Sequence, residues 1–198
     1  MIQSSAAKNW AVFLSLVVLI LGAAAAWLST VELVDDNIRL TVRHSVQFAY
    51  PFLLLALLAR PLKTLLRKPW TAKLLRRRRL LGVAFAGAMT AHLILIAFRF
   101  SWSPELTYPP GSLAIGAAAY LLLYLMFITS FDGPTRALGP RRWKALHRTG
   151  LIWAGLIFAV PRSVAEIVEF EYLKLGVPML IVLLIRFLAW RRSTTPGS

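Results

Sequence analysis

The sequence is organised around residues 76–98, which read RRRRLLGVAFAGAMTAHLILIAF. Four arginines precede nineteen residues from Leu80 to Phe98, in which Thr90 and His92 are the only clearly polar side chains. As an α-helix these nineteen residues would be about 28 Å long, enough to cross a bilayer core of about 30 Å. The stretch therefore predicts a membrane-spanning helix whose arginine-bearing end stays on the cytoplasmic side.

His92 is the candidate functional residue of this helix, at a depth of about 18 Å from Leu80. Inside a membrane an ionisable side chain deserves a functional hypothesis, and a neutral imidazole offers one nitrogen to a metal. One interpretation is a packing histidine bonded to a neighbouring backbone or hydroxyl group. The other is an axial ligand of a b-type heme held between helices. Small residues surround His92 and would let a helix or a flat macrocycle approach the backbone: Gly82, Ala84, Ala86, Gly87, Ala88 and Ala91.

The composition indicates an all-α integral membrane protein. Of the 198 residues 58% are hydrophobic and the mean hydropathy is +0.66, whereas soluble domains are about 45–50% apolar. The chain has no cysteine, so it offers no thiolate ligand, and its three histidines are His44, His92 and His147. The net charge of +15 does not indicate nucleic-acid binding, because the basic segments alternate with apolar residues and lie between spans.

Six apolar runs predict a six-helix transmembrane bundle within a single domain, residues 1–192. The expected spans are about 10–28, 45–59, 80–98, 112–131, 147–167 and 172–190, followed by a disordered tail at 193–198. The first run also resembles a cleaved signal peptide, an alternative that leaves the later topology unchanged. Arg60-Pro61 is expected to stop the second span, and residues 62–75 to lie as a basic amphipathic segment on the inner leaflet. Asp132-Gly133-Pro134 is expected to end the fourth span.

The distribution of basic residues predicts the sidedness of this bundle. With both termini in the cytoplasm, 17 of the 23 lysines and arginines lie on the inner side and 5 on the outer side. Of the eight acidic residues only Asp132 lies inside. This bias is a strong positive-inside signal, as expected of a protein that crosses its membrane several times.

The remaining candidate side chains carry weaker signals. His147 begins the fifth run beside basic residues and His44 lies at the outer mouth of the second, so both can be interfacial. Arg186 lies about one turn from the inner surface, where it snorkels or clasps a heme propionate. Arg162, Glu166 and Glu169 are spaced as on a solvated helix face. No P-loop, Rossmann glycine fingerprint, HExxH or GxSxG pattern occurs, and no catalytic residue is predicted.

Two stretches together resemble the ferric reductase-like transmembrane family. Arg78-Arg79-Leu80-Leu81-Gly82, continuing through Phe85 to Ala91-His92, is similar to its third-helix signature. The second stretch is similar to the connection between the family's fourth and fifth helices. It consists of Phe127-Ile128-Thr129-Ser130, Leu138-Gly139, Trp143 and Leu146-His147-Arg148. Leu53 to Leu62, which ends in Arg60-Pro61-Leu62, fits its second helix. The likeness covers about residues 40–190 and is closest to the heme-binding membrane subunits of bacterial periplasmic methionine sulfoxide reductase systems.

This resemblance implies a b-type heme protein that passes electrons across the inner membrane. The donor would be quinol or a cytosolic flavin reductase, and the acceptor a periplasmic partner protein. His92 matches the third-helix heme ligand and His147 the Leu-His position of the fifth helix. Flavin or quinone is a further possible cofactor, and the basic inner loops would suit a flavin phosphate or an acidic docking face. The chain would then be an oxidoreductase component and not a complete enzyme.

One position departs from the family pattern. The family has a further histidine about thirteen residues beyond its Leu-His, where this chain has Val160, which cannot ligate iron. His92 and His147 differ in depth by about 15–20 Å, too far to share one heme. Three alternatives remain: His92 binds alone, another group such as His44 completes the site, or the chain has lost its heme. In the last case it is a scaffold that serves as an interaction or assembly subunit of a membrane complex.

Overall fold

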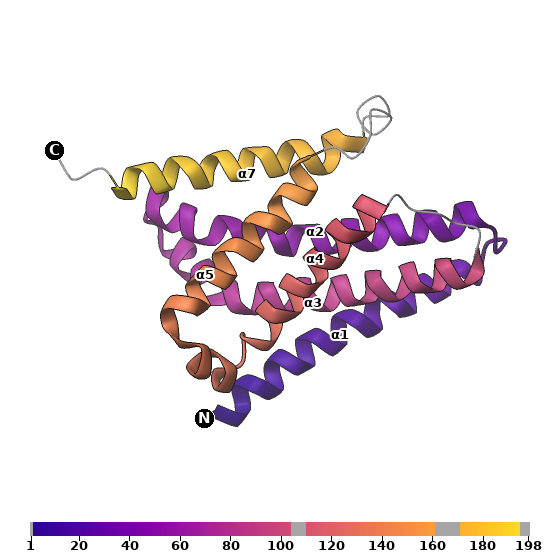
Figure 1. Cartoon of the computed structure of the whole chain (residues 1–198), viewed down its shortest axis with the longest axis horizontal. Helices are drawn as coiled ribbons and strands as arrows, with labels where there is room; N and C mark the ends of the chain where they lie inside the picture. Colours follow the sequence, from indigo (N-terminus) through magenta and orange to yellow (C-terminus); the bar gives the residue numbers. More distant parts are fainter. Residues whose placement is uncertain (1, 104–109, 161–170, 195–198) are drawn as a thin grey trace.

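The computed structural model describes residues 2–103, 110–160 and 171–194 of the chain (Figure 1). These ranges contain helices and their connections but no strand, which confirms the all-helical prediction. The helices are α1 (Ile2–Leu28), α2 (Asp35–Leu66), α3 (Pro69–Trp102), α4 (Pro110–Ile128), α5 (Asp132–Ala159) and α7 (Glu171–Thr194).

Four helices of the described part, α1 to α4, are long and apolar enough to cross a membrane. The expected spans 10–28, 45–59, 80–98 and 172–190 fall within α1, α2, α3 and α7, and α4 ends three residues before the expected limit. The expected fifth span begins in α5, and its part beyond residue 160 lies outside the described residues, as do Arg162, Glu166, Glu169 and residues 195–198. The membrane fold is thus supported, while the count of six spans stays a prediction.

The boundary between α2 and α3 differs from the expectation. Helix α2 continues through Pro51 and Pro61 and ends at Leu66. Membrane helices tolerate interior prolines because neighbouring groups satisfy the backbone groups that the proline frees. The actual break follows at Arg67, whose φ of 50° is left-handed, and α3 begins with Pro69 in its first turn. Residues 62–75 are therefore the end of one helix and the start of the next, not one amphipathic helix.

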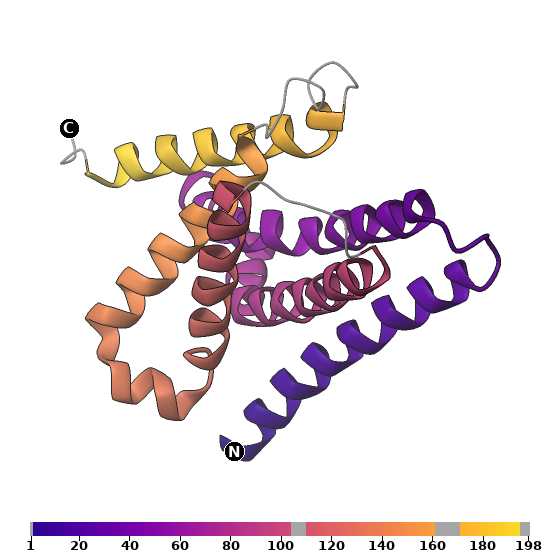
Figure 2. The same ribbon diagram turned by 45° about the vertical axis from the view of Figure 1, so that its right-hand side comes forward.

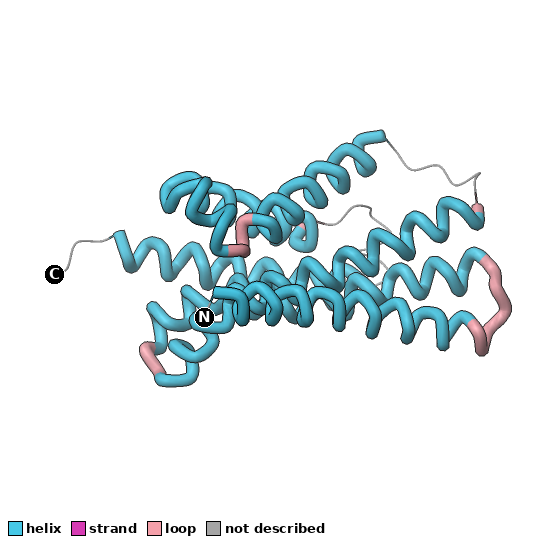
Figure 3. The backbone as a smooth tube through the Cα atoms, turned by 90° about the horizontal axis from the view of Figure 1, so that it is seen from below, coloured by secondary structure: helices cyan, strands magenta, loops and turns pink. Residues whose placement is uncertain are grey.

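The helices form an elongated bundle with two distinct ends. Helices α1, α2 and α3 run side by side along it, α4 and α5 lie obliquely across them, and α7 lies along α2 (Figures 1 and 2). The loop at residues 29–34 and the turn at 67–68 mark opposite ends (Figure 3). We call the end with residues 60–79 and 132–148 the basic end, and the end with residues 29–37 the opposite end.

The most extensive packing joins α2 to α3, a contact we call the α2–α3 seam. Leu53 and Leu57 of α2 and Val83 of α3 are fully buried in its apolar part. At the opposite end, the Arg99 guanidinium donates from Nε and Nη2 to the two carboxylate oxygens of Asp35, at 2.9 and 2.8 Å. Because Arg99 is buried, this two-pronged ion pair fixes the register of the seam.

Helix α1 reaches α3 at Gly87. A Cβ atom there would lie only 2.6 Å from the Phe13 carbonyl oxygen, whereas a Cβ at Gly82 would meet nothing within 4 Å. The ring of Phe13 also stacks on Phe127 of α4, with ring centroids 4.5 Å apart. Part of the small-residue face predicted to accept a helix or a macrocycle is therefore covered by α1.

We expect Asp35→Asn to lower the free energy of unfolding in detergent, because it removes the carboxylate held by buried Arg99. The effect is smaller than for a fully buried pair, since Asp35 is 43% exposed. The matched control is Asp36→Asn, whose ion pair with Arg39 is exposed on both sides and should change stability by less than about 0.5 kcal/mol. Chemical unfolding followed by circular dichroism measures both, and equal effects would contradict the role given to Asp35.

Gly87→Ala should lower the free energy of unfolding by about 1–3 kcal/mol, since the added methyl group meets the α1 backbone. Gly82→Ala, on the same helix and in open space, should raise it by up to about 1 kcal/mol through helix propensity. The same unfolding measurement compares the two variants. If both stabilise the protein, α1 does not approach α3 as closely as described.

Candidate functional site

His92 lies half-buried on α3 and turns one ring nitrogen toward α2. Its Nδ1 atom is 2.9 Å from Ser45 Oγ and 3.1 Å from the Val42 carbonyl oxygen. The Ser45 hydroxyl itself donates to the Val42 carbonyl at 2.7 Å. These three groups bring together positions 47 and 50 residues apart in the sequence, in the middle of the α2–α3 seam.

The partners of His92 define its protonation. A carbonyl oxygen only accepts, and the Ser45 hydroxyl hydrogen is already directed to Val42, so Nδ1 must carry the proton. In the neutral ring the lone pair is then on Nε2. Metal-ligating histidines show the same arrangement, in which the other ring N–H donates to a carbonyl group and fixes the ring. The contact fits the packing interpretation as well, since a packing histidine also donates to a neighbouring carbonyl group.

His147 is held by its other ring nitrogen, Nε2. Its Nε2 atom lies 3.2 Å from Thr129 Oγ1, and the Thr129 hydroxyl donates at 2.6 Å to the Leu125 carbonyl. We therefore assign the proton to Nε2, which donates to Thr129. The Trp143 ring stacks on His147 with centroids 4.2 Å apart, and its Nε1 donates to the Thr129 carbonyl at 2.8 Å. Thr129, Trp143 and His147, all within the stretch that resembles the family, thus form one cluster joining α4 to α5.

The structure does not bring His92 and His147 together. Arg79 of α3 pairs with Asp132, the first residue of α5, at 2.8 Å, which puts the start of α5 beside the basic end. His147 contacts Thr129, three residues before Asp132. His92 lies thirteen residues beyond Arg79 on α3, about 20 Å of helix from that end. Within the described ranges no three His, Cys, Asp or Glu side chains are grouped so as to hold a metal ion. Any heme at His92 would need its second axial group from elsewhere.

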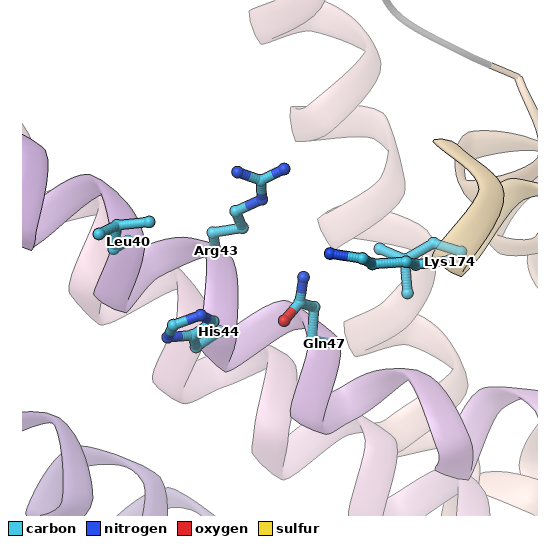
Figure 4. Close-up of a pocket in the computed structure, with 6 residues that line it drawn as sticks. Leu40, Arg43, His44, Gln47 and Lys174 are labelled. Atoms are coloured by element: carbon cyan, nitrogen blue, oxygen red, sulfur yellow. The ribbon is translucent and has the colours of Figure 1, made fainter. Parts of the chain in front are cut away.

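His44 faces away from the α2–α3 seam. It is exposed, and it lines a cavity of about 390 Å³ between α2 and α7 together with Leu40, Arg43, Gln47, Lys174 and Leu175 (Figure 4). Because neighbouring helix positions point about 100° apart, the ring of His44 does not follow Ser45 toward His92. His44 therefore lies apart from the contacts of His92, and its interfacial position stays a prediction.

Arg186 lies half-buried on α7 near the basic end, where the charges of Arg60 and Arg148 act on it. Arg60 follows Ser45 by fifteen residues on α2, about 22 Å of helix. This separation keeps Arg186 away from a group bound at His92. The predicted clasp on a heme propionate would have to involve a heme nearer the basic end.

Sequence reasoning missed the partners that orient the two histidines. Ser45 was taken only as the start of an apolar run, although a serine buried in a span needs an acceptor and is itself a signal. The Val42 carbonyl carries no sequence signal at all. For His147 the signal was present, since Thr129 and Trp143 belong to the stretch that resembles the family.

Several curated proteins are similar to this chain. The protein-methionine-sulfoxide reductase heme-binding subunit MsrQ of Cronobacter sakazakii is 37% identical over 108 residues, 51% of this chain and 52% of that protein. The MsrQ of Herminiimonas arsenicoxydans is 29% identical over 182 residues, 87% of this chain and 82% of that protein. The magnetosome protein MamZ of Magnetospirillum gryphiswaldense is 26% identical over 155 residues, 75% of this chain and 23% of that protein.

The matches differ in how much they cover. The chain spans about half the length of several MsrQ relatives. The match covers 52% of the protein from Cronobacter sakazakii and 53% of the protein from Polaromonas naphthalenivorans. No family model and no solved structure matches the chain. The bacterial relatives and the four membrane-capable helices agree with a multi-pass protein of a bacterial inner membrane. The chain is thus similar to the MsrQ heme-binding subunits, the group that its third- and fifth-helix motifs resemble.

Proposed function

We propose that the chain binds a b-type heme through His92 and acts as an electron-transfer subunit in the inner membrane. The observation that carries this proposal is the position of His92 Nδ1, within hydrogen-bond distance of the Val42 carbonyl and of Ser45 Oγ, which assigns the proton to Nδ1 and the lone pair to Nε2. The relatives named as heme-binding subunits support the choice of heme. A bound heme supplies reversible one-electron chemistry at its iron.

The side chains around His92 can supply one axial ligand to a heme. Nε2 of His92 would hold the iron, while Val42 and Ser45 would fix the ring plane and raise the basicity of the ligating nitrogen. Ala88 and Ala91, both fully buried, add no bulk beside the ring. His147 and His44 remain candidates for a second ligand. His147 would first have to give up its bond to Thr129 or use Nδ1, and His44 would have to turn from the α7 side of α2.

The topology that goes with this function has six spans and both termini in the cytoplasm. The basic end then faces the cytoplasm, where a quinol or a flavin reductase would deliver electrons. His92 lies ten residues from the end of α3 at Trp102 and thirteen from Arg79, so it is nearer the opposite end. This position suits delivery to a periplasmic acceptor, and the names of the relatives point to a methionine sulfoxide reductase.

A second candidate function is that of a heme-free interaction or assembly subunit with the same helical scaffold. Two observations favour it. Val160, at the position where the family has a further histidine, ends α5 in extended conformation and is 59% exposed. The Nε2 atom of His147 is engaged by Thr129.

The absorbance spectrum decides between the two functions. We expect protein purified in detergent after expression with ample heme to show a Soret band and dithionite-sensitive bands, and His92→Ala to lose them. Thr90→Ala is the control, because Thr90 is the other polar residue of the span and contacts Tyr124 instead of α2. A colourless wild-type protein would favour the heme-free subunit, and an unchanged spectrum in His92→Ala would remove His92 from the site.

The orientation of His92 can be tested separately. Ser45→Ala removes one of the two acceptors of the Nδ1 proton and should weaken heme binding about tenfold, the lower end of the effect of losing a group that orients a ligand. Thr41→Ala is the control, since this buried hydroxyl bonds only to Asn37 of its own helix. Heme titration of the apoprotein gives both affinities. Equal losses would show that the Ser45 contact does not orient the ligand.

A further inference from the structure

Four arginines from four helices meet near the basic end. They are Arg60 of α2, Arg78 of α3, Arg148 of α5 and Arg186 of α7, and we call them the arginine cluster. Arg78 and Arg186 are half-buried, and Arg60 and Arg148 are exposed. No sequence motif groups them, because they are spread over 127 positions of the chain.

The packing around Gly155 brings three of them to one level. A Cβ atom built on Gly155 would lie 3.2 Å from Leu183 Cδ2 and 3.7 Å from Leu57 Cδ1, so α5, α7 and α2 are in contact there. Arg60 follows Leu57 by three residues on α2, and Arg186 follows Leu183 by three residues on α7. Arg148 precedes Gly155 by two turns, and since α5 runs opposite to α2 and α7, it reaches the same end (Figure 1).

Arg78 joins the cluster from α3. Its Nε donates to the Ala56 carbonyl oxygen of α2 at 3.1 Å, which holds the guanidinium against the helix that bears Arg60. Arg60 and Arg186 are near enough for their charges to repel that of Arg78, and Arg60 and Arg148 likewise repel Arg186. The geometry therefore holds four positive charges together although they repel each other.

No carboxylate of the described residues balances these charges. None of the four arginines forms an ion pair within the described part of the chain, and Asp132, at the same end of the bundle, pairs with Arg79 at 2.8 Å. Glu32, Asp35 and Asp36 lie at the opposite end. An anion bound among the guanidinium groups would offset the repulsion and satisfy their hydrogen-bond donors.

We propose that the arginine cluster binds a phosphate group, supplied by an anionic phospholipid headgroup of the inner leaflet or by free phosphate. The guanidinium fork matches phosphate oxygens, and basic pockets between helices on the cytoplasmic side suit lipid headgroups. Arg78 lies two residues before Leu80, where the apolar run of α3 begins, so the cluster lies at headgroup depth. On α7 the exposed side chains of Leu184, Phe187 and Leu188 offer an apolar surface for acyl chains. This site needs no heme and goes beyond the proposed function.

The test uses the full-length protein in detergent and native mass spectrometry with phosphatidylglycerol, phosphatidylcholine or inorganic phosphate. The test variant is Arg60→Gln with Arg148→Gln, two exposed positions whose replacement spares the packed arginines. The control is Arg76→Gln with Arg77→Gln, which removes the same charge from exposed positions on α3. We expect phosphatidylglycerol to bind at least about tenfold more weakly to the test variant, and at most about threefold more weakly to the control.

The arms of the experiment separate the two phosphate sources. Loss of phosphatidylglycerol binding in the test variant alone assigns the site to a lipid headgroup. Binding of inorganic phosphate with the same dependence, without a preference for phosphatidylglycerol over phosphatidylcholine, assigns it to free phosphate. Equal losses of phosphatidylglycerol binding in the test and control variants would mean that net charge alone weakens binding, and would overturn the proposal.

A single substitution guards against misfolding of the double variant. Arg186→Lys keeps the charge and removes the guanidinium fork, so it should weaken phosphate binding at least about threefold with unchanged circular dichroism. Unchanged binding in Arg186→Lys would also overturn the proposal, because the fork of this half-buried arginine would then contribute nothing.

Discussion

The register between α2 and α3 is the constraint on which both candidate sites depend. Three polar contacts lie along this seam: Arg99 with Asp35 at the opposite end, His92 with Val42 and Ser45 in the middle, and Arg78 with Ala56 near the basic end. Apolar side chains gain little by leaving lipid for another helix, so such contacts select the register inside a membrane. A shift of one turn, about 5.4 Å, would break all three together. The same register therefore orients His92 and places Arg78 in the arginine cluster.

The two histidines of the family-like stretches differ in where they hold a proton, and this difference separates their chemistry. His92 donates from Nδ1 to a carbonyl oxygen, which leaves the outer nitrogen of the ring with its lone pair. His147 donates from Nε2 to a threonine whose own hydrogen is committed to Leu125. The same side chain thus keeps the lone pair on Nε2 in α3 and uses Nε2 for a packing contact in α5. The acceptor each ring meets on the neighbouring helix decides the outcome.

The sequence predicted features that depend on local composition and missed those that depend on a partner helix. The apolar run from Leu80 to Phe98 lies entirely within α3, a break separates α4 from α5 just before Asp132, and the likeness to the MsrQ subunits is supported by the curated MsrQ relatives. Hydrophobic composition gives the length of a helix but not its neighbour. The contact of Gly87 with α1 and the bonds of His92 to α2 could therefore not be read from it. The continuation of α2 through Pro61 depends on packing beyond the local signal.

The separation of His92 from the arginine cluster argues that the two features have different ligands. Some 22 Å of helix α2, on an ideal rise, divides Ser45 from Arg60, so one group at His92 cannot also balance the four arginines. Their environments differ too, since a neutral imidazole tolerates a dry site whereas clustered guanidinium groups need an anion or water. A heme at His92 would leave the repulsion at the basic end unchanged. An anion that offsets this repulsion would therefore be separate from any heme, as the proposed lipid phosphate is.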